Sequence, residues 1–72
     1  MDLEKREYLE IFLEEFYADV LYDYEDRVIN SLLHDRIAEE LDAISEDKDG
    51  DVDKLIEYAY GLKNMYMMFT LC

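Results

Sequence analysis

His34 is the only histidine of the chain and the side chain best suited to acid–base chemistry near neutral pH. Ser31 precedes it by three residues, so the two side chains share one face of a helix. Nucleophilic catalysis by such a pair also needs an oxyanion hole, and nothing in the sequence supplies one. Carboxylate pairs arise by chance among twenty acidic residues, and glycine-rich phosphate loops are absent from the sequence. We therefore predict no catalytic residue, no enzymatic activity and no cofactor.

Residues 47–53, which read Asp-Lys-Asp-Gly-Asp-Val-Asp, form a dense local cluster of carboxylates. The segment resembles the calcium loop of EF-hand proteins, which has glycine at its sixth position and a bidentate glutamate at its twelfth. If Gly50 is the sixth residue, Ser45 replaces the usual first aspartate and Ile56 stands at the twelfth position. Both departures weaken the site, so we predict no metal site, and weak calcium binding remains an alternative. The segment is then an interhelical loop in which Asp51 caps the following helix.

Apolar residues recur at steps of three and four along most of the chain, which is typical of amphipathic helices. Proline is absent and the only glycines are Gly50 and Gly61, so few residues interrupt a helix. We predict helices over residues 2–21, 24–45 and 51–69. The predicted fold is one all-α domain, a small three-helix bundle, either monomeric or as a homodimer.

The boundary between the first two predicted helices carries no helix breaker. We place the turn near Asp23, where Asp23 or Asp26 would cap the second helix. The predicted apolar faces consist of Leu9, Phe12, Leu13, Phe16 and Val20 in the first helix, Val28, Ile29, Leu32, Leu33, Ile37, Leu41 and Ile44 in the second, and Val52, Leu55, Ala59, Leu62, Tyr66 and Phe69 in the third.

The charge balance is strongly acidic, with twenty Asp and Glu against seven Lys and Arg and a net charge of -13. Such a field repels phosphate and anionic lipid, so we predict direct contact with neither nucleic acid nor membranes. It attracts basic surfaces, of which nucleic-acid-binding proteins have the largest. The single cysteine, Cys72, excludes an internal disulfide, and no signal core or membrane span is evident. We therefore expect a cytoplasmic protein.

The glutamates of the first helix gather on the side opposite its apolar face. On a helical wheel they fall within roughly 80° of Glu7. Like charges three and four residues apart disfavour a helix by a few tenths of a kcal/mol per pair, so this row indicates a contact surface. Apolar residues lie among and beside the acids, a mixture that suits protein binding. The predicted partner-binding residues are Glu4, Glu7, Glu10, Ile11, Glu14, Glu15, Tyr17, Asp19 and Leu21.

The number of carboxylates is comparable with the charge of a DNA segment, because 30 Å of duplex carries about 18 phosphates. In composition the chain is similar to the acidic DNA-mimic inhibitors that phages and mobile elements make against restriction, CRISPR or transcription machinery. The similarity extends to no residue motif. It implies that the partner is a basic, nucleic-acid-binding protein whose phosphate-binding groove the chain occupies. The alternative is that the acids only keep the protein soluble.

The third predicted helix is apolar around more than one face. Methionine and tyrosine side chains suit adaptable protein contacts. Tyr60, Met67 and Met68 are therefore candidates for a second interface, and a dimerising adaptor or regulatory protein is the alternative function. A terminal helix buried on all sides would explain the same composition.

Overall fold

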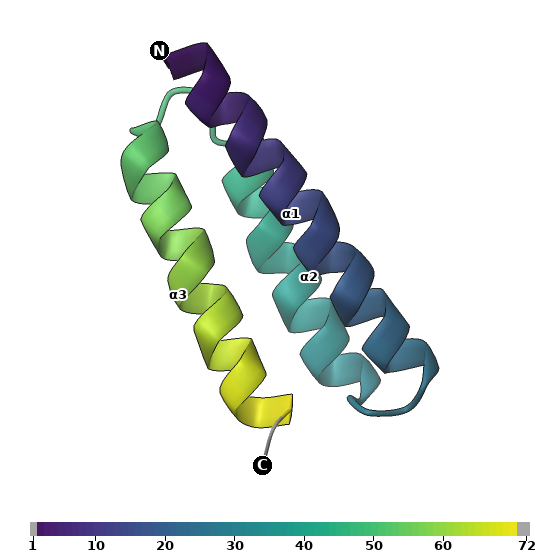
Figure 1. The fold of residues 1–72 in the computed structure, drawn as a ribbon. Coiled ribbons are helices and arrows are strands. Elements are labelled where there is room, and N and C mark those ends of the chain that lie inside the picture. The colour runs from purple at the N-terminus through teal and green to yellow at the C-terminus, as the bar shows by residue number, and fades with distance from the viewer. Residues whose placement is uncertain (1, 71–72) are drawn as a thin grey trace.

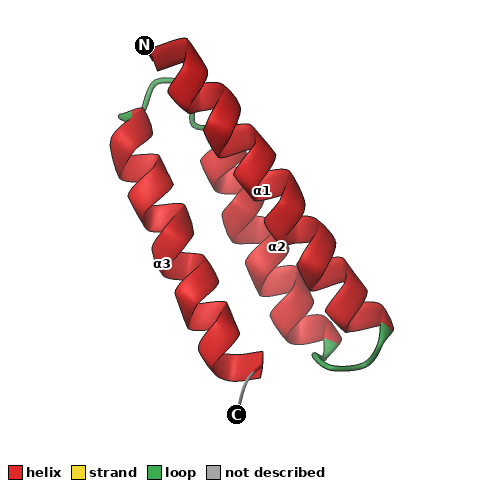
Figure 2. Cartoon of the chain, viewed as in Figure 1, coloured by secondary structure: helices red, strands yellow, loops and turns green. Residues whose placement is uncertain are grey.

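The computed structural model describes residues 2–70. Within this range lie three α-helices, α1 (Asp2–Glu25), α2 (Ser31–Glu46) and α3 (Val52–Thr70), and no strand (Figure 2). Successive helices run in opposite directions, so the two loops lie at opposite ends of an elongated bundle of 39 × 19 × 15 Å (Figure 1). The predicted all-α three-helix bundle is confirmed. Cys72 lies outside the described residues.

The core is built from apolar side chains at the three- and four-residue steps of all three helices. Leu9, Phe16 and Val20 of α1 are shielded from solvent, and the Phe16 ring packs edge-on against Tyr66 of α3 with centroids 5.6 Å apart. α1 packs against both other helices, whereas α2 and α3 contact each other least. The buried residues are Leu9, Leu13, Phe16, Val20, Ile29, Ile37, Leu41, Ile44, Ala59, Leu62 and Tyr66.

The first turn lies later in the chain than the sequence predicted. α1 continues to Glu25, so the turn placed near Asp23 is wrong. No residue between Asp23 and Glu25 breaks the helix, and the chain reverses only where Arg27 adopts the left-handed conformation, with φ at 64°. The backbone N–H of Val28 donates to the carbonyl of Asp23 over 2.8 Å and closes the turn.

The cap of α2 is an asparagine instead of the predicted aspartate. Asn30 has an extended backbone, and its side-chain oxygen accepts a hydrogen bond of 2.9 Å from the Leu33 N–H. Asp23 and Asp26 are therefore not caps of this helix, and α2 begins at Ser31 instead of residue 24. The predicted cap of α3 is confirmed, because Asp51 Oδ1 accepts from the Asp53 N–H over 3.0 Å.

Three residues assigned to the apolar faces are exposed. Val28, Leu32 and Phe69 were predicted to face the core, and all three lie largely in solvent. Val28 belongs to the loop before α2, while Leu32 and Phe69 lie beside the seam between α2 and α3. Because these two helices meet least closely, the apolar residues along their seam stay uncovered.

Polar contacts of Asp23 and Arg6 help to tie α1 to the rest of the bundle. The hydroxyl of the buried Tyr66 donates to the Asp23 carboxylate over 2.6 Å. Burial of Tyr66, reinforced by this hydrogen bond, raises its pKa above that of an ordinary tyrosine. The Arg6 guanidinium donates to the carbonyls of Ser45 and Asp47 over 2.7 and 2.9 Å, at the carboxyl end of α2. These carbonyls are groups that the helix itself leaves unpaired.

Candidate functional site

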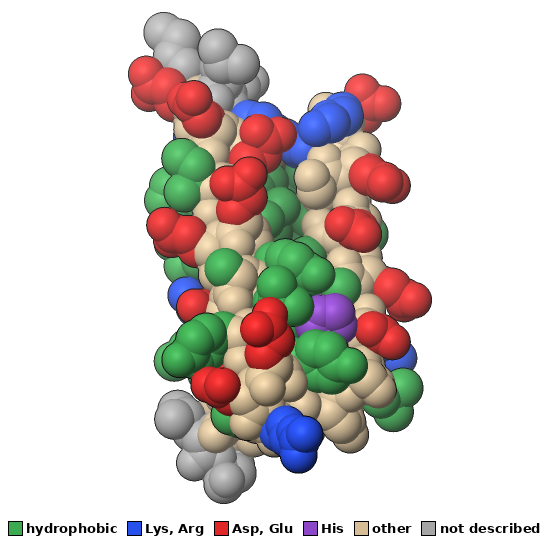
Figure 3. All heavy atoms as spheres, turned by 90° about the vertical axis from the view of Figure 1, so that its right-hand side faces the viewer, with side chains coloured by type: hydrophobic (Ala, Val, Ile, Leu, Met, Phe, Trp, Pro, Cys, Tyr) green, Lys and Arg blue, Asp and Glu red, His purple; other side chains and the backbone are tan. Residues whose placement is uncertain are grey.

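Acidic side chains line one broad face of the bundle, formed by α1 and α2. Figure 3 shows this face, with Asp and Glu side chains along both helices and apolar side chains gathered between them. The glutamates predicted from the first helix, Glu4, Glu7, Glu10, Glu14 and Glu15, are all exposed. The exposed acids of α2 are Asp35, Glu39, Asp42 and Glu46.

A shallow groove of about 390 Å³ separates the two helices on this face. Its carboxylates come from both sides, with Glu10 and Glu14 on α1 and Asp42 on α2. Leu13 and Leu41 form part of the apolar floor, and the other lining residues are Tyr17, Ala38 and Ser45. A basic side chain of a partner could enter between acids of opposite walls while its aliphatic part rests on the floor.

The carboxylates of the groove differ in how far they are neutralised. Glu10 Oε1 lies 3.7 Å from Arg6 Nε and 3.6 Å from Lys48 Nζ, so two cations of the chain already face it. Glu14 and Asp42 make no ion pair within the described part of the chain. Among the carboxylates that line the groove, Glu14 and Asp42 are therefore more available to a partner than Glu10.

The sequence did not predict Asp42 as a site residue. A helical wheel places it on the polar side of α2 but does not show which acids of α1 it will face. That depends on how the antiparallel helices are aligned, which no local pattern encodes. The pairing of Glu10 with Lys48 was missed for the same reason.

The predicted apolar contacts lie at different distances from the groove. Tyr17 lines it, and its ring lies 5.9 Å from the ring of His34. Ile11 and Leu21 are exposed but are not among the groove residues. Asp19 lies on the other side of α1, in a depression shared with Lys63 of α3. The predicted partner-binding residues therefore extend around α1 instead of forming one compact site.

His34 belongs to the same face but is arranged as a packed residue. Its ring stacks on Tyr24 with centroids 4.7 Å apart, and Nδ1 lies 3.1 Å from Asp35 Oδ1. Nε2 is buried and has no hydrogen-bond partner among the described residues. Ser31 makes no hydrogen bond to His34 in this part of the chain. Nor do the described residues include a group of three or more His, Cys, Asp or Glu that could hold a metal ion.

The three residues of the predicted second interface are exposed and differ in their surroundings. The Tyr60 ring packs on Phe12 of α1 with centroids 4.7 Å apart, and its hydroxyl is hydrogen-bonded to that of Tyr8. This hydrogen bond is the main reason that the pKa of Tyr8 is raised. Met67 lines the depression between α1 and α3, whereas Met68 is exposed and absent from that lining. Tyr60 and Met67 thus contribute to the α1–α3 seam.

Comparison of the chain with protein-family models, with curated proteins and with solved structures gave no match. None of the described helices combines the length and apolar character needed to cross a membrane.

Proposed function

We propose that this chain is a non-enzymatic acidic binding protein of the cytoplasm that occupies the basic, phosphate-binding groove of a nucleic-acid-handling protein. In this role the chain would be an inhibitor made by a phage or mobile element, and it would block restriction, CRISPR or transcription machinery. The observation that supports it best is the α1–α2 groove, where Glu14 and Asp42 face solvent from opposite walls without an ion pair in the described chain.

The magnitude of the charge is compatible with phosphate mimicry. A duplex as long as the bundle, 39 Å, carries about 23 phosphate charges. The chain has twenty carboxylates and a net charge of -13, a little over half of that value. A groove that binds duplex DNA would therefore attract the protein strongly at low ionic strength.

Charge alone would not select one basic protein among many. Electrostatic attraction mainly speeds association, whereas packed apolar contacts slow dissociation. Tyr17 lines the groove, and Leu21 and Ile11 are exposed on the same helix. These three side chains would provide the selective contacts around the acids.

The proposal is tested by displacement of DNA. Proteins of a host lysate that bind a duplex-DNA column are purified, loaded with a fluorescent duplex and titrated with the chain while anisotropy is recorded. We expect displacement that weakens by about tenfold or more as the Debye length falls from roughly 30 Å at 0.01 M salt to 8 Å at 0.15 M. The double variant Glu14→Lys, Asp42→Lys should displace the duplex at least tenfold less well.

The matched control is the double variant Asp26→Lys, Asp49→Lys. It changes the net charge by the same amount at two exposed loop positions outside the groove. The control should retain most of the displacement. An equal loss of DNA displacement in both double variants would mean that only the total charge matters and not its position in the groove. If the unaltered chain displaces no DNA, the result would favour a dimerising adaptor whose acidic residues serve solubility.

A further inference from the structure

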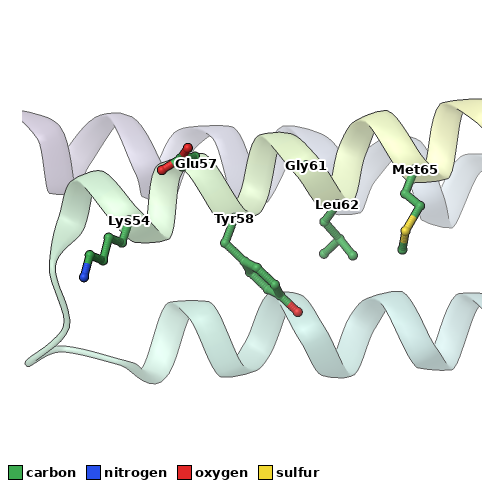
Figure 4. Close-up of a pocket in the computed structure, with 6 residues that line it drawn as sticks. All are labelled: Lys54, Glu57, Tyr58, Gly61, Leu62 and Met65. Atoms are coloured by element: carbon green, nitrogen blue, oxygen red, sulfur yellow. The ribbon is translucent and has the colours of Figure 1, made fainter.

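The seam between α2 and α3 is an open apolar groove. Three neighbouring hollows of about 450, 450 and 520 Å³ share lining residues and so form one continuous surface. In Figure 4, Tyr58, Leu62 and Met65 project from α3 toward α2. The large apolar side chains along the groove, between 51 and 78% exposed, are Val28, Leu32, Tyr58, Met65 and Phe69.

This groove is electrically neutral in a strongly acidic protein. Its charged lining residues are two cations, Arg36 and Lys54, and two carboxylates, Glu40 and Glu57. The net charge of -13 is therefore carried elsewhere on the chain. Two copies of a protein with this charge repel each other, and they approach with least repulsion through a neutral face.

We propose that the α2–α3 groove binds a second copy of this chain and forms a two-fold symmetric dimer. Arg36 and Glu40 lie one helical turn apart on α2. A two-fold axis that crosses α2 between them sets Arg36 of each copy opposite Glu40 of the other, so the charges of the groove are self-complementary. A basic helix of another protein would gain little electrostatic attraction here, because the cations Arg36 and Lys54 offset the two carboxylates of the groove.

The exposed apolar surface could form the centre of such an interface. Five side chains that are more than half exposed lie along one continuous groove, and contiguous apolar patches of a few hundred Å² mark protein–protein interaction sites. A standard interface buries roughly 800 Å² on each partner, so the four charged side chains of the groove and their neighbours on α2 and α3 would complete the contact.

The dimer would leave the acidic face free. α1 packs on the side of α2 and α3 away from their open seam, so the α1–α2 groove is not covered. The assembly would present two acidic faces to a partner that itself has two-fold symmetry, which is a property beyond the proposed function of the single chain.

Sedimentation equilibrium of the full chain tests the proposal. We expect a dimer whose dissociation constant decreases as salt is raised from about 0.01 M to 0.5 M, because salt screens the repulsion between the copies. Leu32→Glu, at a position 78% exposed, should weaken association by about tenfold or more without affecting the fold. The matched control is Met68→Glu, which adds the same charge at a position 70% exposed outside the groove lining and should remain dimeric.

A charge exchange tests the arrangement of the two copies. Arg36→Glu should weaken the dimer, and the double variant Arg36→Glu, Glu40→Arg should recover it. A monomer at every salt concentration would overturn the proposal, and so would equal weakening by Leu32→Glu and Met68→Glu. Failure of the double variant to recover would overturn the two-fold pairing. The result is independent of DNA displacement, so the proposed function and this interface can fail separately.

Discussion

Replacement of Tyr66 by phenylalanine should remove the hydrogen bond between α3 and Asp23 while keeping the aromatic packing. Tyr66 is 5% exposed, and its hydroxyl lies 2.6 Å from the carboxylate of Asp23. Hydrogen bonds to charged groups contribute about 1.5–3 kcal/mol. Asp23 is only partly buried, so water can replace the lost donor, and we expect the lower end of this range. A loss of about 1.5 kcal/mol corresponds to a decrease in Tm of roughly 6–12 °C for a domain of this size.

The effect should depend on pH in a defined direction. The pKa of Tyr66 is raised in the folded chain, whereas in the unfolded chain it is about 10. The stabilisation by Tyr66 is therefore complete below pH 10 and is lost as the pH rises from 10 toward the folded pKa. At pH 11, ionisation in the unfolded chain removes about 1.4 kcal/mol. The difference between the unaltered chain and Tyr66→Phe should then approach zero, because the other tyrosines titrate in both proteins.

The measurement is urea unfolding followed by circular dichroism at pH 7 and pH 11. Tyr22→Phe is the control, since Tyr22 is 69% exposed and its hydroxyl makes no hydrogen bond to the described residues. This control should change the free energy of unfolding by less than about 0.5 kcal/mol. A difference for Tyr66→Phe that stays constant between the two pH values would refute the reasoning.

Two further pairs of substitutions test the local structure by urea unfolding at pH 7. Gly61→Ala should stabilise the fold by about 1 kcal/mol, because Gly61 lies inside α3 and an added Cβ meets no atom within 4 Å. Gly50→Ala is the control. Its Cβ would lie 2.7 Å from Asp47 Oδ2, so this substitution should give no such gain. Asn30→Ala should destabilise the fold by about 1 kcal/mol, because α2 loses its cap. Asn30→Asp keeps an acceptor oxygen and should be nearly neutral. An equal loss of unfolding free energy in the two variants would contradict the capping role.

The helices and most of the core could be predicted from the sequence because they depend on local spacing. Leu9, Leu13 and Phe16 follow the three- and four-residue steps of a helix, and the structure buries all three. The first turn could not be placed because Asp23, Asp26 and Asn30 are all good caps, and no glycine or proline marks the boundary.

The candidate surfaces were predicted less completely because they depend on how the helices pack. The wheel of α1 correctly placed Glu7 and Glu14 in solvent. It could not show that Lys48, far along the chain, approaches Glu10. Similarly, periodicity identifies Leu32 and Phe69 as apolar but does not reveal that α2 and α3 leave them uncovered.

Arg6, near the start of α1, stabilises the carboxyl end of α2 through its hydrogen bonds. Arg6 precedes every residue whose side chain the structure describes as buried, so a shortened chain starting at residue 7 would keep all of those core residues. Such a chain would nevertheless lose the donor to the carbonyls of Ser45 and Asp47, and the last turn of α2 would fray. Glu10 would also lose one of the two cations that face it, so its carboxylate would be less neutralised, although the net charge would not change because residues 1–6 contain two acids and two bases.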